Sequence, residues 1–410
     1  MYPNSPLLKS DIAGVARLVT DATTGITDLV EAMHARIARP PGFPAGAAAG
    51  RTSGITGFVY GAVRGVTRAV GVGVEALIDL APAFGSDAPA PQRDALVAAL
   101  NGVLGDHLVA TGNPLAKPME LRHDGRALPD DPAELAARLP EAASGVIVFL
   151  HGLCMTEGQW VRAGRDRGAE LAADLGLTTL RLDYNTGLHV SQNGAALAAR
   201  LEALVDQWPR PLERIVLVGH SMGGLVARSA EIHAVEAGLR WRNLLTDMVF
   251  LGTPHHGAPL EKAGHWLDVV LGATPYAAPF ARLGRVRSAG IADLRHGALH
   301  EDDRKGGAGV GVFADRRRPR PLPADVECWT IAAATAQADN RFADGVIGDG
   351  LVPLASALGQ HRDPARALAF PTDHQRVVRG IGHLEPMWSD EVFEQMRAWL
   401  ARPAAPSAVG

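Results

Sequence analysis

Residues 215–227 of the chain read IVLVGHSMGGLVA. The first four residues are a short, continuous apolar run, which is typical of a strand buried on both faces. The pentapeptide Gly219-His220-Ser221-Met222-Gly223 follows directly, and the apolar residues after it favour a helix. A serine at a sharp strand-to-helix turn is the arrangement of a nucleophile elbow, in which the turn requires minimal side chains on both sides. We therefore predict that Ser221 projects above a sheet as a nucleophile.

The sequence around this turn alternates short apolar runs with helical segments. Such alternation predicts a parallel sheet with helices on both faces, and hence an α/β fold class with a mostly parallel central sheet. An early hairpin is expected at 119–125, where His123-Asp124-Gly125 supplies the turn. The expected strands are 146–150, 179–182, 215–218, 248–251 and 328–332, and the expected helices are 93–104, 194–208 and the segment from 224 through His233.

The apolar run 146–150 ends in His151-Gly152-Leu153. Acyl transfer requires N–H donors aimed at the oxygen on which negative charge develops. The amide of Met222, at the start of the helix after Ser221, is one candidate. The loop after an earlier strand should supply the second, and Gly152 lets the backbone turn there. The predicted oxyanion hole is therefore formed by the amides of Leu153 and Met222.

A serine nucleophile needs a base, and in this arrangement the base follows the acid in the chain. Three histidines lie in the C-terminal quarter of the sequence, His361, His374 and His383. His383 lies in a turn, Gly380-Ile381-Gly382-His383, just after the apolar pair Val377-Val378 and before a final helix. Because that is a loop at the carboxyl end of a strand, we predict His383 as the base. His361 and His374 lie in polar stretches and are expected in solvated loops.

The acid must lie between the serine and the histidine, where it holds the imidazole in the correct tautomer. Asp349, in Gly348-Asp349-Gly350, follows the strand at 328–332 by one loop and precedes His383 by 34 residues. Asp344 is a near duplicate five residues earlier, and either aspartate could simply initiate a turn. We favour Asp349 and keep Asp344 as the alternative.

In combination, these motifs resemble those of bacterial triacylglycerol lipases and of the related inositol-deacylase-like esterases. The resemblance covers about 146–399 and implies the α/β-hydrolase fold, the triad Ser221, Asp349 and His383, and an acyl-ester substrate. In such lipases the Gly-Thr-Pro-His turn is structural, so His255 and His256 are not expected to be catalytic. Some of these lipases bind calcium, but no dense carboxylate loop here demands it, and we expect no metal and no cofactor. The matching motifs are His151-Gly152, the pentapeptide around Ser221, Gly252-Thr253-Pro254-His255-His256-Gly257, Asp349-Gly350-Leu351-Val352 and His383-Leu384-Glu385.

The first 95 residues differ from the rest of the chain. Apolar residues from Ile12 to Ile37 recur every three or four positions, which predicts a long amphipathic helix. A second helix is expected at about 54–80, where a small residue recurs every four positions. We expect either a helical hairpin packed on the catalytic domain or on a second copy, or a surface that lies on lipid. The catalytic domain is predicted at 106–405, with a lid-like insertion at about 272–323, where the periodicity fails.

Composition narrows the choice of compartment and partner. The net charge of −4 implies no polyanion partner, so no nucleic acid is expected. Two cysteines are too few for a disulfide scaffold or a zinc cage. The sequence shows neither a secretory signal nor a transmembrane run, which predicts a cytoplasmic protein that can also lie at the periphery of a membrane.

The leading hypothesis is a carboxylic-ester hydrolase that acts through an acyl-enzyme. The insertion and the apolar N-terminal helices favour a hydrophobic, lipid-like ester. Two alternatives stay open. The same triad would serve an acyltransferase, in which an alcohol or thiol replaces water. The helices could instead belong to a non-catalytic protein that binds lipid surfaces.

Overall fold

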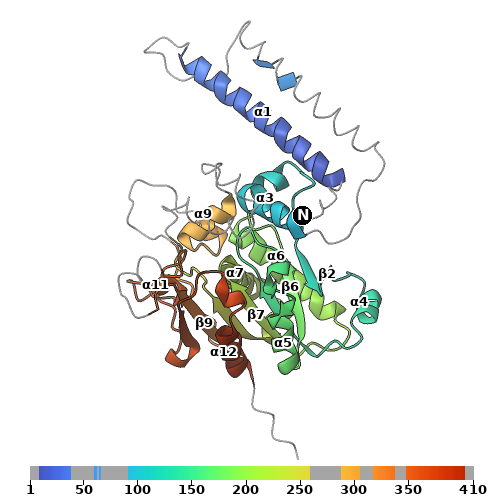
Figure 1. Ribbon diagram of the computed structural model, residues 1–410, viewed down its shortest axis with the longest axis vertical. Coiled ribbons are helices and arrows are strands. Elements are labelled where there is room, and N and C mark those ends of the chain that lie inside the picture. Colours follow the sequence, from blue (N-terminus) through green and yellow to red (C-terminus); the bar gives the residue numbers. More distant parts are fainter. Residues whose placement is uncertain are drawn as a thin grey trace, which may run out of the picture. The chain divides into compact units, whose positions relative to one another are not determined.

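The computed structural model contains two compact units, 1–93 with 108–116, and 94–107 with 117–410. The second unit is built on one large sheet (Figure 1). Each unit is considered by itself below. The residues that the structure describes are 9–37, 60–61, 64–65, 91–258, 288–304, 317–337 and 348–401.

Within the described residues, the central sheet has eight strands in the order β10-β9-β8-β7-β3-β6-β1-β2. All pairs from β10 to β6 are parallel, whereas β1 is antiparallel to both β6 and β2. The mostly parallel sheet predicted from the sequence is thereby confirmed. The strands are β1 (Glu120–His123), β2 (Arg126–Ala127), β3 (Gly145–Leu150), β6 (Thr178–Asp183), β7 (Arg214–His220), β8 (Leu245–Leu251), β9 (Glu327–Ala334) and β10 (Gln375–Arg379).

The central strands β3 and β7 are mostly apolar and buried, as expected where helices cover both faces of a sheet. Every residue of β3 is buried. Val146 and Val148 join the core under α6 (Val190–Gln207) and α7 (Met222–Ala237), while Ile147 and Phe149 join the core under α5 (Arg167–Asp174) and α12 (Asp390–Leu400). Because successive side chains of a strand point to opposite faces of the sheet, β3 contributes residues to two separate cores. Figure 1 shows these helices around the sheet.

Shorter elements complete the second unit. The predicted hairpin is present, with Asp124 and Gly125 at positive φ in its turn. The remaining elements are α4 (Pro132–Arg138), η1 (Glu157–Trp160), β4 (Val161–Arg162), β5 (Arg165–Asp166), η2 (Arg240–Leu244), α9 (Ala289–His296), η5 (Glu301–Asp303), α11 (Leu354–Ala357), η6 (Thr372–His374) and η7 (Glu385–Met387).

Helix α3 (Pro91–Ala110) is longer than the predicted helix at 93–104. Its residues 94–107 belong to the second unit, where Ala99 and Val103 enter the main core. A Cβ on Gly102 would overlap the sulfur of Cys154. The helix therefore packs directly on the loop that follows β3.

In the first unit, α1 (Lys9–Ile37) confirms the long helix predicted from its apolar stripe. The helix docks through its polar and small side chains. Arg93 donates two hydrogen bonds to the carboxylate of Asp11, and Gly14 packs on Leu115. The first three apolar positions of the stripe are exposed, with Ile12 39%, Val15 51% and Val19 61% exposed.

Two predicted segments fall largely outside the described residues. Of the helix expected at 54–80, the structure describes only 60–61 and 64–65, which are helical. Of the insertion expected at 272–323, it describes 288–304 and 317–323, which include α9. Among the described helices, none combines the length and apolarity needed to cross a bilayer.

Candidate active site

The turn between β7 and α7 is strained at Ser221. Its φ of 52° and ψ of −120° are uncommon for a residue with a side chain. Neighbouring glycines make this turn possible: a Cβ on Gly219 would overlap the backbone of Gly224, and a Cβ on Gly223 would overlap the carbonyl of Leu150. The structure thus confirms the strand–serine–helix turn and the requirement for glycine on both sides. Strain that the surrounding structure maintains is characteristic of functional positions.

The loop after β3 lies against this serine. A Cβ on Gly152 would be 3.2 Å from the Cβ of Ser221 and 3.1 Å from the sulfur of Met155. Any larger residue at Gly152 would therefore press on Ser221. In the described part of the chain, the N–H of Leu153 donates to no acceptor. The N–H of Met222 starts a helix and has no partner within it. Both predicted oxyanion donors therefore belong to segments that meet at Ser221.

The predicted base and acid form a buried pair. Nδ1–H of His383 donates to Oδ2 of Asp349 over 2.7 Å, and both side chains are almost fully buried. The other oxygen, Oδ1, accepts the N–H groups of Leu351 (3.0 Å) and Val352 (2.8 Å). The carboxylate is thus fixed on one side by the backbone and on the other by the imidazole.

This pair lies next to the serine turn. The N–H of Ser221 donates to the carbonyl of Leu251 at the end of β8, and Gly252 follows in the chain. A Cβ on Gly252 would be 3.3 Å from Asp349 Oδ2 and 3.4 Å from His383 Nδ1. The structure therefore brings Ser221, His383 and Asp349 to the carboxyl ends of neighbouring parallel strands, where ligands of open α/β sheets bind.

His220 adds a contact that the sequence analysis did not include. Its Nε2–H donates to the carbonyl oxygen of His383 over 2.8 Å. Burial, followed by repulsion from His383, lowers the pKa of His220 to about 3, so the ring is neutral. The residue before the serine thereby fixes the backbone of the predicted base. His220 belongs to the pentapeptide around Ser221, but no spacing in the sequence predicts its contact with His383.

The other candidates occupy different environments. Asp344 lies outside the described residues. His361 is half-buried rather than solvated as predicted, and its ring centroid lies 4.9 Å from that of His256. His374 is not solvated as predicted, because its ring stacks on Trp329 at 3.7 Å and Nδ1–H donates to the carbonyl of Cys328. His255 is fully buried, and burial keeps its pKa well below the ordinary value. That environment fits the structural role expected for the Gly-Thr-Pro-His turn.

Backbone contacts hold the loop after β3 in place. The hydroxyl of Tyr184 donates to the carbonyl of His151 over 2.7 Å, and the two rings stack at 4.5 Å. The N–H of Cys154 donates to Oγ1 of Thr186 over 3.1 Å. Nδ1–H of His151 donates to the carbonyl of Gly152. The segment after β6 thus fixes both ends of the predicted oxyanion loop.

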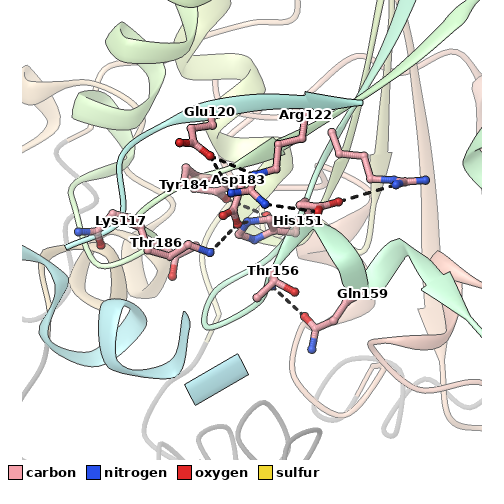
Figure 2. Close-up of polar contacts among 12 residues, drawn as sticks. Lys117, Glu120, Arg122, His151, Thr156, Gln159, Asp183, Tyr184 and Thr186 are labelled. Carbon is pink, nitrogen blue, oxygen red and sulfur yellow. Dashed lines mark hydrogen bonds and ion pairs between the residues drawn. The ribbon is translucent and has the colours of Figure 1, made fainter. Parts of the chain in front are cut away.

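A buried charged cluster lies beneath the same loop (Figure 2). Nζ of Lys117 lies 2.6 Å from Oδ1 of Asp183, and Nε2 of His151 lies 3.5 Å from the same oxygen. Burial alone would raise the pKa of Asp183, but the His151 and Lys117 contacts outweigh it and hold this pKa well below the ordinary value. The aspartate is therefore ionised, and it anchors the imidazole of His151. Sequence reasoning missed this cluster because its members come from three separate segments.

Helix α9 reaches the other side of the elbow. The N–H of Gly290 donates to the carbonyl of Gly187 over 3.0 Å, and a Cβ on Gly290 would be 2.9 Å from Cε of Met222. Ser221 is only 3% exposed. The part of the predicted insertion that the structure describes thus packs beside the candidate site.

The sheet order and the elbow define an α/β-hydrolase fold, as the resemblance implied. Residues 142–277 match the family model described as the PGAP1-like alpha/beta domain, a lipase- and esterase-like family within that fold. No curated protein matches the chain.

Several solved structures are distantly similar. The Bacillus licheniformis lipase BlEst2 in its mature form is 21% identical, with a TM-score of 0.41, over 64% of this chain and 94% of that chain. The esterase of Pyrobaculum calidifontis is 15% identical, with a TM-score of 0.38, over 75% of this chain and 90% of that chain. The Pyrococcus furiosus esterase Pf2001 is 14% identical, with a TM-score of 0.35, over 63% and 79%.

Proposed function

We propose that this chain is a carboxylic-ester hydrolase that acts through Ser221, His383 and Asp349. The observation that carries the proposal is the buried His383–Asp349 hydrogen bond of 2.7 Å beside a strained serine turn. A serine, a base and an acid that orients the base are the three parts that nucleophilic acyl transfer requires.

In the proposed mechanism, Oγ of Ser221 attacks the ester carbonyl, and Nε2 of His383 takes its proton. Asp349 keeps the proton of the neutral imidazole on Nδ1 and stabilises the imidazolium that forms. The imidazolium then protonates the departing alcohol, which leaves an acyl group on Ser221. Water attacks this acyl-enzyme by the same route and releases the acid.

The amides of Leu153 and Met222 are proposed to stabilise the tetrahedral oxyanion. Gly152 lies against Ser221, and the Leu153 N–H has no acceptor in the described residues, which supports this assignment. Because Tyr184 and Thr186 hold the loop, its donors need little reorganisation as charge develops.

We further propose that the ester is lipid-like and that α1 contacts a lipid surface. Within the first unit, the start of helix α1 buries Asp11 and Ala13 and exposes Ile12, Val15 and Val19. A helix with its apolar residues outside is suited to lie in a membrane interface. The position of α9 beside Met222 supports a lid role for the insertion, because moving α9 would uncover the elbow.

Labelling and substrate series test the enzyme proposal. A fluorophosphonate probe should modify the wild-type chain at Ser221 and leave Ser221→Ala unlabelled. Hydrolysis of p-nitrophenyl esters should rise from acetate toward longer acyl chains. Labelling at another residue, or equal labelling of Ser221→Ala, would contradict the triad. A preference for acetate would retain the esterase and reject the lipid-like substrate.

Product analysis separates hydrolysis from acyl transfer. With a soluble alcohol added, a hydrolase releases mainly free acid, whereas an acyltransferase forms mainly the new ester. Predominant ester formation would replace the proposed function with the acyltransferase alternative.

Liposome flotation tests the contact of α1 with lipid. The full chain with Ile12, Val15 and Val19 changed to Glu should lose flotation with anionic vesicles. A matched variant, Val161→Glu, changes an exposed valine in the second unit and should float like the wild type. Equal flotation of all three proteins would reject the lipid contact. Substitution is preferable to removing residues 1–95, because α3 begins at Pro91.

A further inference from the structure

Three potential metal ligands converge far from the candidate triad. His233 and Glu236 lie near the C-terminal end of α7, and His300 precedes η5. One ligand atom from each of the three lies within 4.8 Å of the others. Nε2 of His300 is 3.2 Å from Oε2 of Glu236, and the rings of His233 and His300 are 5.3 Å apart. The sequence does not predict this cluster, because more than sixty residues separate His300 from the other two.

His233 presents an unpartnered ring nitrogen to this cluster. Its Nε2 is buried and has no hydrogen-bond partner among the described residues. An imidazole nitrogen without a hydrogen-bond partner, beside a second histidine and a carboxylate, can serve as a metal ligand.

We propose that His233, Glu236 and His300 form a binding site for a divalent transition metal of the zinc type. Two imidazoles and one carboxylate suit Zn²⁺, with water as the fourth ligand. Two ligand atoms that each lie about 2.0–2.1 Å from a tetrahedral ion are about 3.3 Å apart. The separation of 3.2 Å between His300 and Glu236 matches that geometry. His233, near the C-terminal end of α7, would complete this tetrahedral geometry through a small movement of its side chain.

Asp302 contacts the ring nitrogen of His300 that faces away from Glu236. Nδ1 of His300 accepts the N–H of Asp302, which places the ring proton on Nε2 toward Glu236. When the metal takes the place of this proton, Nδ1 must carry the ring proton instead, so the N–H of Asp302 has to turn away, and Nδ1–H can then donate to the carboxylate of Asp302, which lies 3.5 Å away. A carboxylate behind a metal-bound histidine is a common arrangement. Arg320 lies 3.9 Å from the other oxygen of Glu236 and leaves Oε2 available.

The metal would have a structural role. His233 follows Ser221 by twelve helical residues, which is about 18 Å along α7 at about 1.5 Å per residue. The ion is therefore too far away to touch the reacting atoms. It would join α7, whose first residue follows the nucleophile, to the segment after α9. That segment is already held by a hydrogen bond of 2.6 Å from Ser229 to the carbonyl of Leu299. Metal binding would tighten the described part of the insertion against the catalytic core.

Metal binding by the intact chain tests this inference without any activity assay. The full chain, stripped with EDTA, is titrated with Zn²⁺ against a chromophoric chelator. We expect one tightly bound equivalent in the wild type and none in His300→Ala. Glu236→Gln should weaken Zn²⁺ binding by more than about tenfold, since the loss of a group that only orients a metal ligand already lowers metal affinity by about 10–100-fold. His361→Ala removes a half-buried histidine elsewhere and should bind like the wild type.

Thermal unfolding provides the second measurement. Zn²⁺ should raise the Tm of the wild type and of His361→Ala but not of His300→Ala or Glu236→Gln. Glu236 is half-exposed, so its change to Gln should leave the metal-free Tm unaltered even if His300→Ala disturbs packing. Identical Zn²⁺ stoichiometry and affinity in the wild type and Glu236→Gln would overturn the site, as would a wild type that binds no Zn²⁺. Neither outcome affects the proposed esterase, because Ser221 labelling is read independently.

Discussion

Changing Asp349 to Asn should nearly abolish turnover, and the hydrogen bonds around Asp349 explain why. Oδ1 accepts two backbone N–H groups, from Leu351 and Val352, and these donors require an oxygen. The Asn side chain must therefore keep its oxygen there and turn its NH₂ group toward His383. Two donors cannot face each other, so Nδ1 of His383 becomes an acceptor. The ring proton then lies on Nε2, where it blocks proton transfer from Ser221.

The expected size of the effect follows from this tautomer change. A base held in the wrong tautomer lowers kcat by about 10⁴-fold in serine hydrolases. At about 1.36 kcal/mol for each factor of ten, this corresponds to about 5.4 kcal/mol of lost transition-state stabilisation. Asn has nearly the volume of Asp and keeps both backbone hydrogen bonds. The free energy of unfolding should therefore fall by less than about 2 kcal/mol.

Steady-state hydrolysis of a p-nitrophenyl ester measures kcat, and urea unfolding measures stability in the same preparation. Asp344→Asn, which changes the alternative acid, should retain kcat close to that of the wild type. A folded Asp349→Asn enzyme whose kcat lies within tenfold of the wild type would refute the assignment. Loss of turnover in Asp344→Asn, with activity kept in Asp349→Asn, would transfer the role of acid to Asp344.

Three further predictions concern the residues around the triad. His220→Ala leaves the carbonyl of His383 without its donor and should lower kcat/KM by about 10–100-fold. His220→Gln keeps an N–H donor and should recover much of this loss. Equal kinetics in both variants would show that the hydrogen bond does not position the base. Gly223→Ala should lower the free energy of unfolding by about 1–3 kcal/mol or prevent folding, because the new Cβ meets the Leu150 carbonyl. Gly158→Ala should be neutral, because the nearest atom to its new Cβ is 3.7 Å away. Similar melting temperatures for the two variants would contradict the packing argument. The pKa of Asp183 in the folded chain lies below its ordinary value of about 3.9, so the unfolded chain binds the proton of this carboxyl group more readily. The stability that Asp183 contributes is therefore complete above about pH 4. It is lost as the pH falls toward the folded-state pKa. Asp183→Asn should therefore flatten the acid side of the stability curve in urea unfolding, and a curve parallel to that of the wild type would count against an ionised Asp183.

Local sequence patterns were sufficient for the fold class, and they also led to the residues that we propose as the triad. The elbow could be recognised because its strand, serine and glycines are consecutive, and a turn that tight admits few other residues. The strand 146–150 could be recognised because a strand buried on both faces has no polar position. His383 could be selected because it lies in a turn just after a strand, and Asp349 because it lies in a turn that follows a strand by one loop. Helix α1 was predicted correctly because apolar residues recur every three or four positions from Ile12 to Ile37 without a break.

The environment of single side chains was harder to predict. His374 lies in a polar stretch, yet its ring stacks on Trp329, 45 residues earlier in the chain. Gly102 of helix α3 packs against Cys154, 52 residues later in the chain. In each case a partner remote in sequence sets the burial, and local composition carries no information about it.

The contacts that surround the site depend on the same kind of remote pairing. His220 reaches His383 because parallel strands bring their carboxyl ends to one edge of the sheet. Lys117 reaches Asp183 because the antiparallel pairing of β1 with β6 places the start of β1 beside the end of β6. His300 meets α7 for a similar reason, because the segment after α9 packs on that helix. Sequence patterns therefore specify which residues can carry the chemistry, since that information is local. Tertiary structure alone decides which side chains orient them, since those contacts arise only when distant segments of the chain pack together.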